Sequence, residues 1–114
     1  MIMAVPRRSL RVDLHGYDVL AALDLALTRV REAYENGYDE VELIHGSASV
    51  STPVDEGRGR IKTELRRLFE SGRFDAWADR SRTWPKAASL LLALKRNPRP
   101  LRERWTGPPR RRHP

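Results

Sequence analysis

The stretch that decides the fold is SLRVDLHG, residues 9–16. Leu10, Val12 and Leu14 alternate with polar residues, and this period of two predicts a strand over 9–15 with one buried face. The stretch EVELIHG, residues 40–46, ends in the same His-Gly pair and predicts a second strand over 40–45. Each glycine opens the turn that follows its strand. Two strands with matching ends therefore frame the first half of the chain.

Helical periodicity separates and follows these strands. Apolar residues recur at spacings of three and four between Asp18 and Asn36, which predicts an amphipathic helix with Asp18 as N-cap and Gly37 as its stop. A second helix is predicted over 58–71, and Gly72 ends it. Beyond it we expect a short edge strand or turn at 74–78, a loop at 80–86 and a last, leucine-rich strand at 88–95.

The element order is therefore β-α-β-α-(β)-β, with the bracketed strand being the short one. Strand–helix–strand units make parallel neighbours through right-handed crossovers. The order predicts a two-layer α/β sandwich, in which two helices cover a small, mixed and mostly parallel sheet. We expect residues 9–95 to form this one domain.

Charge is distributed unevenly along the 114 residues. Residues 1–95 hold 15 Lys plus Arg against 14 Asp plus Glu, whereas residues 96–114 hold seven Arg against one Glu and five of the eight prolines. Such a segment buries too little apolar surface to offset its ordering entropy, which predicts a flexible basic tail that attracts polyanions. With no cysteine and no long apolar run, the sequence predicts a cytoplasmic protein without disulfides, thiolate metal sites or membrane spans.

The two His-Gly pairs predict a shared site. Sites in open α/β sheets form at the carboxyl ends of parallel strands, so His15 and His45 meet there if their strands are adjacent. Two imidazoles can serve as base and acid on a phosphodiester, and Asp13 can orient one of them. Alternatively, these three side chains can hold a divalent cation, or the histidines only cap turns.

A glycine-rich, basic stretch opens the second predicted helix. It reads Gly57-Arg58-Gly59-Arg60-Ile61-Lys62. Main-chain N–H groups at a helix start favour anions, and glycines allow a phosphate to approach closely. We therefore expect this stretch, together with the turn glycines Gly16 and Gly46, to bind phosphate, although as a bare motif it is also compatible with a solvated helix start.

These motifs resemble those of the Smr domain, the small MutS-related domain. Val12-Asp13-Leu14-His15-Gly16 is similar to the family's first motif, and Ile44-His45-Gly46 to the start of its second. The glycine-rich stretch resembles the continuation, after an insertion of ten residues, 47–56. The resemblance spans about residues 9–95 and implies functional residues at Asp13, His15 and His45 and at the glycines Gly46, Gly57 and Gly59.

The resemblance implies an endonuclease that cuts RNA or DNA. RNA can supply its own 2′-hydroxyl as nucleophile and then needs no metal, whereas DNA needs an attacking water and favours a divalent cation. A module that binds nucleic acid or the ribosome without catalysis is the alternative, and a metal-dependent hydrolase of small phosphoesters is a third reading.

Overall fold

The computed structural model describes residues 8–46 and 60–101 of the chain. Its elements are β1 (Ser9–Asp13), α1 (Val19–Glu35), β2 (Glu40–Ile44), α2 (Arg60–Glu70), a short 3-10 helix (Arg80–Arg82), β3 (Trp84–Pro85) and β4 (Ser89–Ala93). The inserted loop and Gly57, Arg58 and Gly59 of the predicted helix start fall on residues 47–59, outside the described residues, as do residues 1–7 and 102–114.

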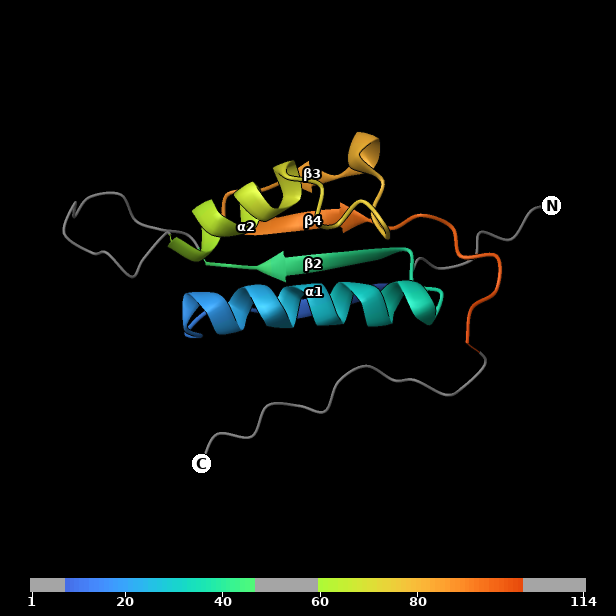
Figure 1. The fold of residues 1–114 in the computed structure, drawn as a ribbon, viewed down its shortest axis with the longest axis horizontal. Coiled ribbons are helices and arrows are strands. Elements are labelled where there is room, and N and C mark those ends of the chain that lie inside the picture. The colour runs from blue at the N-terminus through green and yellow to red at the C-terminus, as the bar shows by residue number, and fades with distance from the viewer. Residues whose placement is uncertain (1–7, 47–59, 102–114) are drawn as a thin grey trace, which may run out of the picture.

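The predicted α/β sandwich is confirmed. The strands form one mixed sheet in the order β1-β2-β4-β3, and both helices run along it and pack against each other (Figure 1). Only β1 and β2 are parallel, because β4 pairs antiparallel with both β2 and β3. The expectation of a mostly parallel sheet is thus wrong in this detail: the chain after α2 returns through a β3–β4 hairpin instead of a second crossover.

Alternation along the strands places the core between sheet and helices. Leu10 and Val12 of β1 are buried while their neighbours are exposed, as the period of two predicted. Leu43 of β2 is fully buried and pairs in register with Val12 and with Leu90 of β4. Ala22, Ala26, Val30 and Ala33 of α1 close the core from the other layer, and these small side chains let the helix approach the sheet closely.

The short strand lies later in the chain than expected. Residues 74–78 form turns, with a single bridge from Ala78 to Leu94, and Phe74 is fully buried there. The two-residue strand is instead Trp84–Pro85, inside the stretch expected to be a loop. Proline lacks the N–H that a central strand must donate, which confines such a segment to a sheet edge.

The chain after β4 stays in contact with α1 for several residues. The Asn97 side-chain amide donates to the carbonyl oxygen of Tyr34 at 2.9 Å, and the Leu101 N–H donates to that of Glu35 at 2.8 Å. The first part of the segment expected to be a flexible tail, residues 96–101, is therefore fastened to the C-terminal end of α1.

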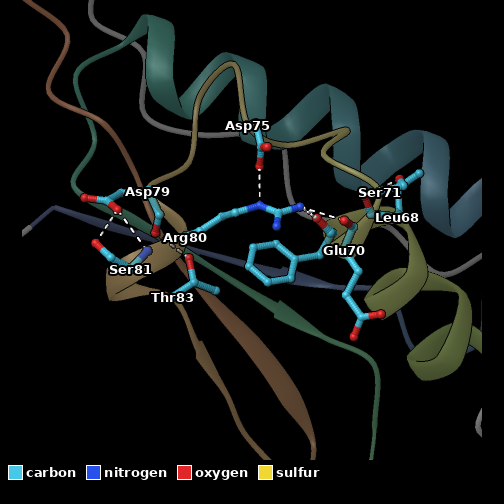
Figure 2. A network of polar contacts seen from close by, with 9 residues as sticks. Leu68, Glu70, Ser71, Asp75, Asp79, Arg80, Ser81 and Thr83 are labelled. Carbon is cyan, nitrogen blue, oxygen red and sulfur yellow. Dashed lines mark hydrogen bonds and ion pairs between the residues drawn. The ribbon is translucent and has the colours of Figure 1, made fainter.

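Arg80 joins the C-terminal end of α2 to the segment that follows it (Figure 2). One terminal nitrogen, Nη2, donates to the carbonyl oxygens of Phe69 and Glu70 at 2.8 and 2.7 Å, and Nε donates to Asp75 at 2.8 Å. Carbonyl groups in the last turn of a helix have no partner within the helix, and a cation there also favours the helix dipole. Arg80 thus satisfies α2 from outside the helix.

Replacing Arg80 by methionine is expected to destabilise the fold by about 1.5–3 kcal/mol, because the charged donor is lost while the aliphatic stem is kept. Little of this is attributed to the ion pair with Asp75, since both side chains are 48% exposed. The urea midpoint measures the effect. The control is Arg67→Met, which removes an exposed arginine paired only with Glu64 and should cost less than about 0.5 kcal/mol. Equal shifts in the two variants would contradict this role of Arg80.

Candidate active site

The two His-Gly pairs lie at the same end of the sheet. β1 and β2 are parallel neighbours, and the register pairs Asp13 with Ile44, so the turns that follow the two strands are adjacent. The Leu14 N–H continues the ladder by donating to the Ile44 carbonyl oxygen at 2.7 Å. The prediction that these strands are adjacent, on which the shared site depended, is confirmed.

The two glycines share the same backbone φ angle. Gly16 and Gly46 both have φ of +85°, in the left-handed region that side chains other than glycine rarely adopt. At Gly46 space is also short, since a Cβ there would lie 3.3 Å from Cδ2 of His15. The His15 ring therefore lies against Gly46, the residue next to His45.

Asp13 holds His15 through the main chain. Its Oδ1 accepts the His15 backbone N–H at 2.9 Å, an arrangement that fixes the turn. The carboxylate was predicted from the sequence to orient an imidazole directly, whereas this hydrogen bond positions the His15 backbone and not its ring. The His15 ring itself is exposed at the carboxyl end of β1.

His45 differs from His15 in being almost fully buried, with 7% of its surface exposed. Its Nδ1 lies 2.8 Å from the Gly46 carbonyl oxygen. A carbonyl only accepts, so Nδ1 carries the proton and Nε2 presents a lone pair. Nε2 is buried and makes no hydrogen bond of normal geometry in the described part of the chain, although the Ser89 backbone acts on the ring and raises its pKa. His45 therefore presents a buried proton acceptor.

Two cations of α2, Lys62 and Arg66, act electrostatically on the His45 ring. Burial lowers the pKa of His45 from its ordinary value, and the charges of Lys62 and Arg66 lower it further. The Arg66 Nε is likewise buried without a hydrogen-bond partner among the described residues. At neutral pH the site thus combines a neutral imidazole with positively charged groups. This combination suits an anionic ligand with a hydroxyl or water proton that the imidazole can accept.

The β3–β4 hairpin forms the remaining wall. The N–H groups of His45 and Gly46 both donate to the Ala88 carbonyl oxygen at 3.0 Å. Lys62 Nζ reaches the Ala87 carbonyl oxygen at 3.3 Å. Sequence reasoning missed this wall, and it missed Arg66, although Lys62 and Arg66 are four residues apart and so share a helix face.

The start of α2 adds to the positive character of the site. Its first turn includes Arg60 and Lys62 and has no acidic residue, so the partial positive charge of the helix end is not offset there. Gly57, Arg58 and Gly59, predicted to bind phosphate, lie outside the described residues. Their proposed contribution stays a prediction.

Within residues 8–46 and 60–101, no three His, Asp or Glu side chains are grouped closely enough to hold a metal ion. Asp13, His15 and His45 therefore do not form the divalent-cation site considered from the sequence. Asp13 points a carboxylate oxygen at a main-chain N–H, and His45 commits Nδ1 to a carbonyl. The arrangement of these three residues therefore does not fit a metal centre.

These features define a small α/β domain in which one end of the sheet carries two histidines and positive charge that attracts anions. The family model described as the Smr domain matches residues 12–84, more than half of the chain, and the chain belongs to this family. Smr domains are a nuclease and nucleic-acid-binding family, so an interaction with nucleic acid follows in general terms. No curated protein and no solved structure shows a significant match.

In the described residues, no helix is long and apolar enough to cross a membrane.

Proposed function

We propose that this protein is an endonuclease that cleaves phosphodiester bonds in RNA or DNA. The observation that carries the proposal is the buried Nε2 of His45, which has no hydrogen bond among the described residues, feels the charges of Lys62 and Arg66, and lies at the same end of the sheet as His15. A neutral base next to fixed cations is what attack on a phosphodiester requires. The cytoplasmic location expected from the sequence belongs to the same proposal.

The proposed roles follow from the positions of the side chains. Nε2 of His45 takes the proton of the attacking oxygen, which is a 2′-hydroxyl in RNA or a water molecule, as that oxygen bonds to phosphorus. The bond to the leaving oxygen then breaks, and that oxygen takes a proton from His15. Lys62 and Arg66 stabilise the negative charge that gathers on the phosphoryl oxygens. Asp13 is a positioning residue that fixes the His15 turn.

The test is cleavage of single-stranded RNA and of supercoiled DNA, each with and without a chelator. We expect the wild type to cut at least one substrate and the His15→Ala, His45→Ala double variant to have lost that activity. The comparison with and without chelator tells whether cleavage uses a divalent cation. Equal activity of wild type and double variant would remove the proposal.

A non-catalytic module that binds nucleic acid or the ribosome is the second candidate. It is favoured by the hydrogen bond of Asp13, which goes to the backbone and leaves the exposed His15 ring without that carboxylate. This candidate predicts salt-sensitive binding by wild type and double variant alike, with no cleavage of either substrate. The same preparations therefore separate the two functions.

A further inference from the structure

A hollow lies at the opposite end of the sheet from His15 and His45. Its volume is about 620 Å³, and its walls come from the turn between α1 and β2, the end of β4, the 3-10 helix and the chain that follows β4. The residues that line it include Tyr38, Asp39, Arg82, Lys95, Arg96 and Pro100. The proposed catalytic mechanism uses none of them.

Unpaired positive charge lines this hollow. Lys95 and Arg96 are exposed, and neither side chain has an ion pair or hydrogen bond among the described residues. Arg82 is held in the wall by Asp79 at 2.9 Å and by the Leu94 carbonyl oxygen at 3.1 Å. The one acidic lining residue, Asp39, already accepts the Arg8 N–H at 2.8 Å. The hollow therefore favours an anion.

The walls are fixed before any ligand arrives. The Leu94 N–H donates to the Asp39 carbonyl oxygen at 2.9 Å, which ties β4 to the turn before β2. Asn97 is bonded to the end of α1, and the Arg8 guanidinium lies 4.3 Å from the ring centre of Tyr38. Preorganised walls reduce the ordering cost of binding.

We propose that this hollow is a second nucleic-acid contact, in which Lys95 and Arg96 bind backbone phosphates. Two observations favour a polyanion. The basic sequence runs on past the rim residue Pro100, with five arginines and one acidic residue in 102–114. The hollow and the end of the sheet that carries His15 and His45 also lie at opposite ends of β2, and the six residue steps from Asp39 to His45 span about 20 Å. A continuous strand can reach both ends, over about six base pairs of a duplex.

This inference rests on the nucleic-acid binding in the proposed function and not on cleavage. The test is the salt dependence of binding of a labelled 20-nucleotide single strand and the matching duplex, measured by fluorescence anisotropy with the full chain. For Lys95→Gln with Arg96→Gln, the slope of log K against log salt should fall in magnitude by about 1.4 for the single strand and about 1.8 for the duplex. The matched control is Arg31→Gln with Arg73→Gln, which removes two other arginines that do not line the hollow.

Each outcome decides the question. A slope change in the first pair alone supports the second contact, even where no cleavage is seen. Equal changes in both pairs attribute the effect to overall charge and overturn it, as does an unchanged slope in a double variant that still binds the strand. Amide NMR shifts at Lys95 and Arg96 on adding the single strand give the location. Shifts confined to the residues around His15 and His45, or full displacement of the nucleic-acid strand by a mononucleotide, would also overturn the proposal.

Discussion

The His45→Gln variant is expected to lose a factor of about 10²–10⁴ in cleavage rate while it keeps its fold. The glutamine side chain keeps an amide near the position of Nε2, but it cannot take up the proton of the attacking group. His45→Asn provides a second variant, because its amide nitrogen lies near the position of Nδ1 and can still donate to the Gly46 carbonyl oxygen. Urea midpoints close to that of the wild type would attribute the loss to chemistry.

The pH profile gives this prediction a second readout. Because burial and the charges of Lys62 and Arg66 lower the pKa of His45, the acid limb of the rate profile should lie below pH 6.5, the ordinary histidine value. Removing a cation favours the protonated ring, so Lys62→Gln should raise the pKa of His45 and move this limb toward pH 6.5. A limb that stays in place or moves to lower pH would contradict His45 as the base.

The same pKa predicts how stability depends on pH. The unfolded chain binds the His45 proton more tightly than the folded domain does, so its neutral form contributes stability fully above about pH 6.5. That contribution is lost as the pH falls from 6.5 through the lower folded-state pKa. Since His45→Gln has no such titration, the difference between its urea midpoint and that of the wild type should change in this window.

The Phe74→Ala variant is expected to be destabilised by about 3–5 kcal/mol. Phe74 is fully buried, and it lies in the turns between α2 and the 3-10 helix, where its ring fills the core under the sheet. A domain of this size is stable by only about 5–12 kcal/mol, so the change removes a large share of the total. The urea midpoint, at unchanged slope, measures the loss.

The matched control for Phe74 is another large apolar residue at the surface. Leu20 is 77% exposed on α1, and Leu20→Ala should change stability by less than about 0.5 kcal/mol. If Phe74→Ala leaves too little folded protein to titrate, Phe74→Leu keeps most of the apolar volume and should show a smaller loss in the same direction. Equal effects of the changes at Phe74 and Leu20 would contradict the placement of Phe74 in the core.

Periodicity and stop residues made most of this fold predictable. The alternation in β1 and β2 and the stripe of α1 are local properties, and Gly37 and Gly72 follow the two helices within two residues, close to their predicted stops. The direction of β4 was not predictable in the same way. It depends on the hairpin with β3, and a two-residue Trp-Pro strand leaves no periodic pattern in the sequence.

The site likewise has features that the local sequence predicts and features that it does not. Each His-Gly pair ends a strand, so their convergence follows once the two strands are parallel neighbours. The partners of Asp13 and His45 depend instead on side-chain directions and on packing between distant segments. Arg66 and the Ala88 carbonyl lie 21 and 43 residues beyond His45, and no local pattern joins them to it.

The position of β4 in the sheet has a consequence for biosynthesis. Of the strands in the described residues it comes last, yet it lies between β2 and β3. As the protein is made from its N-terminus, β2 keeps one edge unpaired until residues 89–93 have emerged, and such an edge readily pairs with a neighbouring chain. Products that stop before Ser89 should therefore aggregate instead of forming a partial domain. His15 and His45 are translated within the first 45 residues, but they share a finished site only after β4 is in place.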